Sequence, residues 1–146
     1  MIQRAGLDID VYVLMGGQVE DDFIHTPDKP LVIIGTLDQI VSRQLMRGYC
    51  AAPASAPLHF DKTNNNARIV IDETQLQDLA YPTAVRIQEF YHKFGGFHPR
   101  ELVLCSATLN PSPLKNLEYE VVEVGEDDFN HPYFSQKLNR NKALHL

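Results

Sequence analysis

The chain is 146 residues long and 44% of them are hydrophobic, which is enough for one compact domain with a core. Its net charge of -6 argues against strong nucleic-acid binding by these residues alone, because neutralising phosphates requires clustered Lys and Arg. No segment approaches the roughly eighteen consecutive apolar residues of a membrane span, and two isolated cysteines favour a reducing, cytoplasmic setting over a secreted scaffold.

Four short apolar runs predict the strands of a sheet. They cover residues 11–15, 31–34, 69–71 and 102–105. Each run is continuous rather than alternating, which is typical of parallel strands covered on both faces. Residues 37–46 and 83–94 have the spacing of amphipathic helices, and the second lies between Pro82 and Gly95. Alternating strands and helices predict an α/β fold with a parallel sheet of four to five strands flanked by helices.

The remaining segments predict a loop and a change of character near the C-terminus. Residues 50–66 contain two prolines and end in three asparagines, so we expect a loop there. Residues 119–124 are compatible with a strand, and residues 134–140 with a short helix. Residues 143–146 resemble the start of another strand, which suggests a fragment or a chain completed by a partner. We therefore divide the chain into a main domain, residues 1–118, and a trailing segment, residues 119–146.

A pair of acids directly after the third apolar run is the strongest functional signal. Asp72 and Glu73 follow the predicted strand, and Gln75 comes two residues later. Carboxylates at the carboxyl end of a parallel strand are placed to hold a nucleotide-bound magnesium ion and to activate water. In that interpretation Asp72 contacts magnesium, Glu73 deprotonates water and Gln75 senses the γ-phosphate. The alternative is an acidic helix cap by Asp72 or Thr74.

A Ser-Ala-Thr turn follows the fourth apolar run, about thirty residues after the acids. The hydroxyls of Ser106 and Thr108 can hydrogen-bond the carboxylate cluster and transmit its state if the two strands are neighbours. An ordinary Ser/Thr turn is the alternative. The nearby Cys105 lies in an apolar run, and we expect it to be a small core residue. The acids and the turn together favour the interior of an NTP-driven nucleic-acid motor.

Two further strand ends carry residues that suit contact with a nucleic-acid backbone. Thr36 and Gln39 follow the second run at the start of a predicted helix, where backbone N–H groups and a hydroxyl can hold a phosphate. Gly16 and Gly17 follow the first run, and glycines permit close approach of a backbone. The plainer alternatives are a helix cap at Thr36 or Asp38 and a tight turn at the glycines. No Gly-x-x-x-x-Gly-Lys-Ser/Thr phosphate loop occurs in the sequence.

These motifs together resemble superfamily 2 helicases, and more narrowly the helicase part of the CRISPR-associated helicase-nuclease of type I systems. The resemblance is carried by residues 13–18 (VLMGGQ), 32–40 (VIIGTLDQI) and 42–49 (SRQLMRGY), in addition to the acids and the Ser-Ala-Thr turn. His131, Pro132 and Leu138 echo the family's segment after that turn. The resemblance covers most of the chain and implies a partial RecA-like sheet, the first RecA-like domain without its phosphate loop.

The resemblance also implies roles for the residues already singled out. Asp72 would take the magnesium position and Glu73 the water-activating position, with ATP and magnesium as cofactors. Ser106 and Thr108 would couple hydrolysis to movement. The contacts to single-stranded DNA would come from Gly16, Gly17, Thr36 and Gln39.

Two departures from the family shape the expected function. The family usually has Asp-Glu-x-His, whereas Gln75 stands in place of the histidine and cannot change charge. The phosphate loop, the second RecA-like domain and the histidine-aspartate nuclease domain are missing from these residues. We therefore expect a truncated or split part of an antiviral, ATP-dependent DNA helicase-nuclease that is inactive alone. The alternatives are a non-enzymatic module that binds the CRISPR interference machinery, and an unrelated α/β binding domain.

The same resemblance implies the partners of the chain. They are single-stranded DNA, the missing helicase portion and other CRISPR interference proteins, with no membrane. Without the phosphate-loop strand the sheet would have an exposed edge, and exposed edges invite pairing. We therefore expect either a homodimer or an edge covered by a partner.

Overall fold

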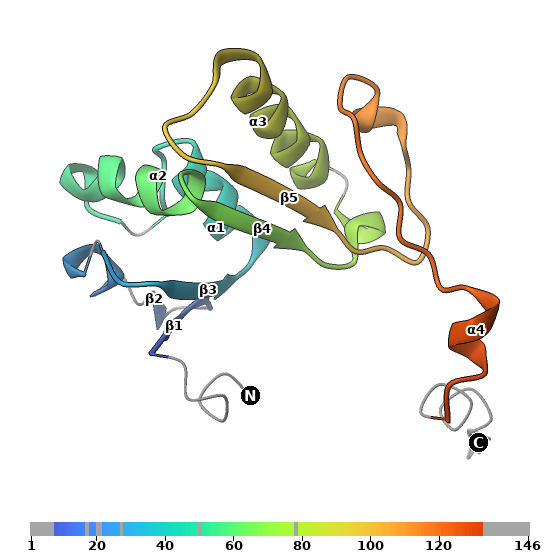
Figure 1. Ribbon diagram of the computed structural model, residues 1–146. Helices are drawn as coiled ribbons and strands as arrows, with labels where there is room; N and C mark the ends of the chain where they lie inside the picture. The colour runs from blue at the N-terminus through green and yellow to red at the C-terminus, as the bar shows by residue number, and fades with distance from the viewer. Residues whose placement is uncertain are drawn as a thin grey trace, which may run out of the picture.

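The computed structural model describes residues 8–132, apart from residues 17, 20, 21, 27, 50 and 78, and these form an α/β fold (Figure 1). The strands are β1 (Asp10–Met15), β2 (Gln18–Val19), β3 (Leu31–Gly35), β4 (Ala67–Ile71) and β5 (Arg100–Leu104). The helices are α1 (Leu37–Gln44), α2 (Ala56–Asn64), α3 (Ala80–Phe94) and α4 (Glu126–Phe129). Short 3-10 turns are η2 (Asp22–His25), η3 (Pro53–Ser55), η4 (Thr74–Leu76) and η5 (Ser112–Leu114). The four predicted strands and two predicted helices are present within three residues of their predicted ends.

The strands form two sheets instead of one. β1 pairs in parallel with β3 and antiparallel with β2, whereas β4 pairs in parallel with β5. The predicted single RecA-like sheet of four to five strands is therefore wrong for the described residues. That prediction assumed strands buried on both faces. Burial alternates along β4 and β5 instead, so that Arg68, Val70, Glu101 and Val103 are exposed and one face of this sheet stays open.

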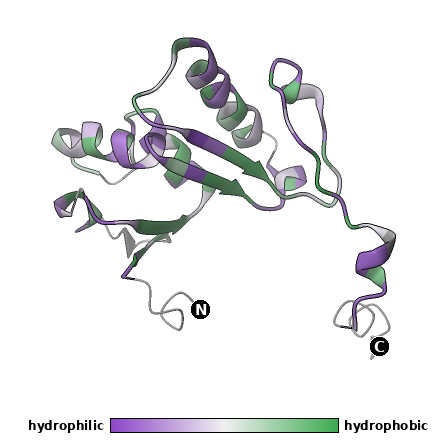
Figure 2. Cartoon of the chain, viewed as in Figure 1, coloured by the Kyte–Doolittle hydropathy of each residue, from purple (hydrophilic) through white to green (hydrophobic). Residues whose placement is uncertain are grey.

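α3 covers the other face of the β4–β5 sheet and supplies its core. Tyr81 and Val85 of α3 form a buried cluster with Leu114, and Leu102 and Leu104 of β5 pack against it. Figure 2 shows that β4 and β5 change in hydropathy along their length, with hydrophilic residues near their starts and hydrophobic residues towards their carboxyl ends. The hydrophobic core of this unit therefore lies close to the strand ends where the predicted functional residues follow.

Proline and glycine residues mark the ends of α3. The helix begins at Ala80, so Pro82 lies in its first turn rather than ahead of it. The first N–H groups of a helix have no partner within the helix, which is why proline is tolerated there. The helix ends before Gly95, whose φ of 75° favours glycine. Gly96 then lies so close to Tyr91 that a Cβ at this position would be 2.7 Å from a ring carbon.

A buried polar cluster joins α1 to α2. Arg43 is fully buried, and its Nε donates to Nδ1 of His59 at 3.0 Å while its Nη1 donates to the side-chain oxygen of Gln39 at 2.5 Å. Asn64 of α2 is also buried, and its Nδ2 donates to the carbonyl oxygen of Gln44 at 3.2 Å. Buried polar groups are tolerated when they are hydrogen-bonded in this way. The two helices are therefore held by specific polar contacts and not by apolar packing alone.

The loop predicted at residues 50–66 is wrong because this region contains α2. Pro57 occupies the first turn of the helix, where proline is favourable. Asn64 ends the helix and donates from Nδ2 to the carbonyl oxygen of Phe60 at 2.9 Å. Pro57 and Asn64 thus begin and end a helix, although prolines and asparagines in such a pattern are typical of a loop.

The segment after η5 runs away from both sheets towards α4 (Figure 1). Residues 119–125 pair with no strand in the described part of the chain, so the strand predicted at residues 119–124 is absent. Its valines Val121, Val122 and Val124 are exposed. Cys105, predicted to be in the core, is also exposed, because it continues the open-face positions of β5. The helix predicted at residues 134–140 and the strand at residues 143–146 lie outside the described residues.

Arg43→Ala is expected to lower the free energy of unfolding by about 2–4 kcal/mol, because it removes the donor shared by His59 and Gln39 inside the protein. Denaturant unfolding followed by circular dichroism measures this loss. Arg47→Ala is the matched control, because Arg47 is an exposed arginine one turn later, and a change within about 0.5 kcal/mol is expected. Equal losses in the two variants would contradict the structural role of Arg43.

Candidate functional site

The carboxyl ends of β4 and β5 lie side by side (Figure 1). Ile71 pairs with Leu104, and the N–H of Cys105 donates to the carbonyl oxygen of Ile71 at 2.9 Å. The pairing continues beyond the strands, because Thr74 donates to the carbonyl oxygen of Cys105 from its N–H at 3.1 Å and from its hydroxyl at 3.4 Å. These bonds hold the segment after β4 against the segment after β5, so the two predicted motifs meet.

Asp72 and Glu73 are exposed at this shared edge, which is called the acidic edge below and comprises Asp72, Glu73, Gln75 and Ser106. Oδ1 of Asp72 accepts a hydrogen bond from the N–H of Glu73 at 2.9 Å. Glu73 itself has φ 51° and ψ 47°, a left-handed conformation that costs a non-glycine residue about 1–2 kcal/mol. Such strained residues are concentrated at functional sites. The backbone thus turns sharply at the second acid.

Gln75 connects the acids to the Ser-Ala-Thr turn. Its Nε2 donates to a carboxylate oxygen of Glu73, and its Oε1 accepts from the hydroxyl of Ser106 at 2.6 Å. The same hydroxyl lies 3.0 Å from the carbonyl oxygen of Thr108. Because a hydroxyl carries one hydrogen, these two acceptors compete for it. The structure therefore joins Glu73, Gln75 and Ser106 in one chain of hydrogen bonds, and the carbonyl oxygen of Thr108 is the alternative acceptor for the hydroxyl of Ser106.

The alternative role of the acids as a helix cap does not match this arrangement. Glu73 precedes η4 but makes no side-chain hydrogen bond to cap it. α3, the next full helix, follows Leu79 and is likewise not capped by a side chain. Asp72 contacts the N–H of the next residue, Glu73, rather than an N–H two or three positions on. The acids therefore have no evident capping function.

The donor set at the acidic edge fits only part of a magnesium–nucleotide site. Among the described residues, no group of three or more His, Cys, Asp or Glu side chains gathers to hold a metal ion. Magnesium is often held by one or two carboxylates together with waters and substrate phosphates, and the exposed Asp72 suits that role. The phosphates themselves would need a cradle of N–H groups and a lysine, and the sequence has no phosphate loop.

The residues predicted to contact nucleic acid are engaged within the protein more than expected. The N–H of Thr36 donates to a carbonyl oxygen of β1 at 3.3 Å, so it does not point at a ligand. The side-chain oxygen of Gln39 accepts from the buried arginine of α1. Gly16 has φ 67°, which the tight turn between β1 and β2 requires, and Gly17 lies outside the described residues. The exposed hydroxyl of Thr36, which does not cap α1, is the group still suited to contact a ligand.

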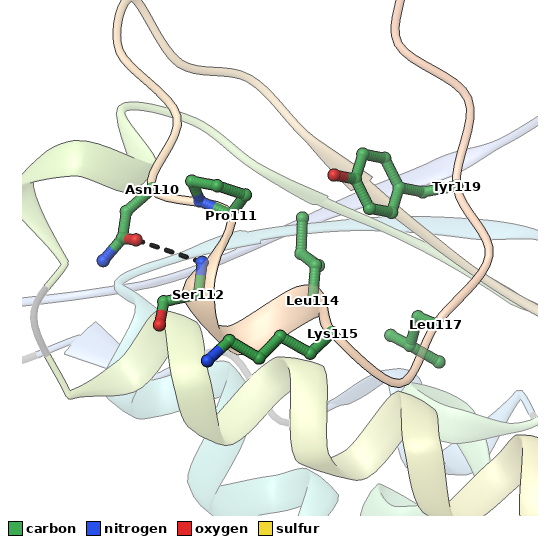
Figure 3. Close-up of a pocket in the computed structure, with 7 residues that line it drawn as sticks. All are labelled: Asn110, Pro111, Ser112, Leu114, Lys115, Leu117 and Tyr119. Carbon is green, nitrogen blue, oxygen red and sulfur yellow. Dashed lines mark hydrogen bonds between the residues drawn. The ribbon is translucent and has the colours of Figure 1, made fainter.

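A hollow of about 480 Å³ lies beside α3, and it shares no residue with the acidic edge (Figure 3). It is lined by Asn110, Pro111, Ser112, Leu114, Lys115, Leu117 and Tyr119. Oδ1 of Asn110 accepts from the N–H of Ser112 at 3.0 Å, and the carbonyl oxygen of Asn110 accepts from the hydroxyl of Tyr81 at 2.9 Å. Burial raises the pKa of Tyr81, so this hydroxyl remains a donor at neutral pH. These bonds hold the loop after the Ser-Ala-Thr turn against α3.

Thr74 positions the site, although its role was not predicted from the sequence. Thr74 is buried, and both its N–H and its hydroxyl donate to the same carbonyl oxygen of Cys105. Its place between Glu73 and Gln75 in the sequence predicts only a helix cap. A buried hydroxyl needs a hydrogen-bond partner, and the neighbouring strand end is the closest source of one. The pairing of the two motifs, once predicted, could therefore have indicated this contact.

Comparisons with known proteins return no significant match: no family model, curated protein or solved structure corresponds to this chain. No helix in the described ranges combines the length and apolar character needed to cross a membrane. The function of the acidic edge is therefore inferred from its own residues and their contacts.

Gln75→Ala and Ser106→Ala are expected to be non-additive, with a coupling of about 0.5–1 kcal/mol in the free energy of unfolding, because one hydrogen bond joins these half-buried side chains. Denaturant unfolding of both single variants and the double variant measures it. Gln75→Ala combined with Thr108→Ala is the control and should be additive, since Thr108 contributes a carbonyl oxygen that alanine keeps. Additive losses for the first pair would show that the two motifs are not linked.

Proposed function

We propose that this chain forms the inner part of a superfamily 2 helicase motor that resembles the CRISPR-associated helicase-nuclease. We also propose that residues 1–146 do not hydrolyse ATP alone. The supporting observation is the chain of hydrogen bonds from Glu73 through Gln75 to Ser106. Gln75 and Ser106 are 31 positions apart, so their contact depends on the fold and is not a local turn. If the two acids occurred by coincidence on an unrelated α/β domain, there would be no reason to expect their hydrogen-bonded connection to Ser106.

The residues at the acidic edge have separable roles in this proposal. Magnesium-bound ATP would supply the transferable phosphoryl group and the electrostatic stabilisation of its transfer. Asp72, whose carboxylate is exposed, would hold the metal ion. Glu73 would accept the proton of the attacking water, and the amide of Gln75 fixes the orientation of its carboxylate.

Ser106 offers a physical route for coupling hydrolysis to movement. Its hydroxyl has two acceptors within hydrogen-bond distance, Oε1 of Gln75 at 2.6 Å and the carbonyl oxygen of Thr108 at 3.0 Å. When the contact of Gln75 with Glu73 changes, the hydroxyl can donate to Thr108 instead. The Ser-Ala-Thr turn would then respond to the state of Glu73 through two alternative hydrogen bonds. Gln75 would do this without the charge change available to the histidine that the family usually has.

The phosphate cradle must come from outside residues 1–146, on the same polypeptide or on another. A phosphate loop supplies backbone N–H groups and a lysine that position and neutralise the triphosphate. The net charge of -6 makes these residues a poor substitute for it. Single-stranded DNA would then be held by the completed motor, with the hydroxyl of Thr36 as one contact.

When the chain is mixed with a polypeptide that carries a helicase phosphate loop, we expect ATP hydrolysis stimulated by single-stranded DNA, and none from the chain alone. Glu73→Gln should abolish the restored activity, because an amide cannot take up the proton of water. Release of inorganic phosphate with and without DNA is the measurement.

Glu118→Gln is the matched control for this experiment, because Glu118 is an exposed acid after η5 and should not affect hydrolysis. Restored activity that survives Glu73→Gln would contradict the role of Glu73. No activity with any phosphate-loop partner would favour the second function considered next.

A non-enzymatic module that binds a protein of the CRISPR interference machinery is the second candidate, and exposed apolar side chains on the sheets favour it. Val70 and Val103 are 59% and 40% exposed on the face of the β4–β5 sheet that α3 leaves open. Val11, Met15 and Ile34 of the other sheet are also exposed. Exposed apolar patches are common at protein–protein interfaces. Such a module would compete with a full-length helicase for its partner.

If sheet edges pair between copies, light scattering is expected to give a mass above the 16.6 kDa of one chain as the concentration rises. Val103→Lys separates the two modes of association. Edge pairing uses backbone groups and should survive this change, whereas association through the open valine face should be lost. A monomeric mass at every concentration would contradict self-association.

A further inference from the structure

Three exposed phenylalanines lie at the carboxyl end of α3 and in the loop that follows it. Phe90 and Phe94 are one helical turn apart, and they are 61% and 68% exposed. Their rings stack with the centroids 5.7 Å apart. Phe97 follows the helix and is 95% exposed. Nζ of Lys93 lies 5.2 Å from the centroid of the Phe94 ring. These four residues are called the phenylalanine face below.

The phenylalanine face is large for a surface that only meets water. A fully buried aromatic side chain covers about 150–250 Å², so the exposed parts of the three rings together present on the order of 400 Å². Apolar areas of this size on a monomer commonly mark interaction sites. At 3.6 residues per turn, Phe90 and Phe94 lie roughly opposite Tyr81, which packs in the core of the β4–β5 unit. The core therefore does not use these rings.

The charges around the phenylalanine face differ in sign from those of the whole chain. Residues 90–98 contain Lys93 and two histidines and no Asp or Glu, whereas the chain has a net charge of -6. The nearest acid before them, Glu89, is paired with Arg86. An apolar segment that carries acids is therefore the partner that complements this face.

The chain itself contains such a segment. Residues 118–124 (EYEVVEV), called the arm below, alternate glutamates with apolar side chains. Val121, Val122 and Val124 are 57%, 89% and 52% exposed. Six of the nineteen acidic residues lie between positions 118 and 128, and this stretch has no Lys or Arg. The arm thus has both the apolar surface and the negative charge that the phenylalanine face lacks.

The arm does not cover the phenylalanine face of its own copy. It begins beside α3, where Nδ2 of Asn116 donates to Oε1 of Glu89 at 3.1 Å. From there it runs away from both sheets towards α4 (Figure 1), and the side chains of the arm and of the face are all exposed. Its seven residues span about 23 Å when extended, which is close to the length of about 22 Å of α3. The arm is therefore long enough to cover the face of a second copy.

We propose that two copies of this chain exchange arms, so that the arm of each copy docks on the phenylalanine face of the other. The valines would cover the rings of Phe90 and Phe94, and the glutamates would lie near Lys93. The arrangement is two-fold symmetric, so each contact occurs twice. Covering both faces and a similar area of both arms buries on the order of 1,600 Å², which is the size of a stable interface.

This association uses neither the sheet edges nor the open valine face, and it does not depend on helicase function. Sedimentation velocity of the full chain over a series of concentrations tests it, and an equilibrium between monomer and dimer is expected. Phe94→Asp and Val122→Asp should each raise the dissociation constant of the dimer about tenfold or more, because a charge would be buried in an apolar contact.

Leu79→Asp and Val103→Asp are the matched controls. They introduce the same charge at exposed apolar residues outside the phenylalanine face and the arm, so the dissociation constant should not change. Equal effects of the controls and the test variants would overturn the proposal. If Phe94→Asp does not fold, Phe97→Asp replaces it, since that side chain is 95% exposed.

A mixture of two variants distinguishes exchange of arms from direct contact between two phenylalanine faces. Phe94→Asp keeps an intact arm, and Val122→Asp keeps an intact face. Neither variant should dimerise alone at a concentration where the mixture forms a heterodimer through one contact between arm and face. A fluorophore on one variant reports this heterodimer as faster sedimentation of the labelled chain. Absence of the heterodimer, with both variants folded, would overturn the exchange.

Two further outcomes assign the association elsewhere. A dimer that survives both Phe94→Asp and Phe97→Asp would overturn the proposal and favour pairing through the sheet edges. A chain that stays monomeric at every concentration would also overturn it. In that monomer, a shift of the backbone amide NMR signals of Phe94 and Phe97 on introducing Val122→Asp would assign the arm to the face of its own copy.

Discussion

Parallel pairing of β4 with β5 is continued beyond both strands by Thr74, whose N–H and hydroxyl donate to the carbonyl oxygen of Cys105. The acidic edge depends on this contact, because it fixes the turn that carries Glu73 and Gln75 beside the loop that carries Ser106. α3 stabilises the same pairing from one face through Tyr81 and Val85. The site is thus positioned by hydrogen bonds to the backbone and by a small core. Asp72 and Glu73 therefore do not have to be buried to hold their places.

The two buried arginines, Arg43 and Arg100, differ in how completely their donors are hydrogen-bonded. Arg43 donates to His59 and to Gln39, and it joins α1 to α2. Arg100 has one donor bonded to Gln88, whereas its Nε and Nη2 have no partner among the described residues. The fold therefore accounts for the donors of Arg43 more fully than for those of Arg100.

The strands β1, β3, β4 and β5, the helices α1 and α3, and the meeting of the two motifs could be predicted from the sequence, because apolar runs ending in polar residues bring strand ends together. The number of sheets could not, since it depends on which side chains of β4 and β5 are covered, and Val70 and Val103 look like core residues in the sequence. Asn64 was misread because asparagine favours loops locally, and its buried contacts with α1 are tertiary. The hydrogen bond from Arg43 to the side chain of Gln39 could not be predicted for the same reason, because the burial of Arg43 is a tertiary effect.

The β4–α3–β5 unit occupies one continuous stretch, residues 67–104, and its pairing needs no distant segment of the chain. Contacts between residues close in sequence form early, because closing a short loop loses little chain entropy. We therefore expect this stretch to be the folding nucleus, with the hairpin of β1 and β2 docking later. This nucleus contains Asp72 and Glu73, and the Ser-Ala-Thr turn follows it within two residues, so the acidic edge would be assembled in the part of the protein that forms first.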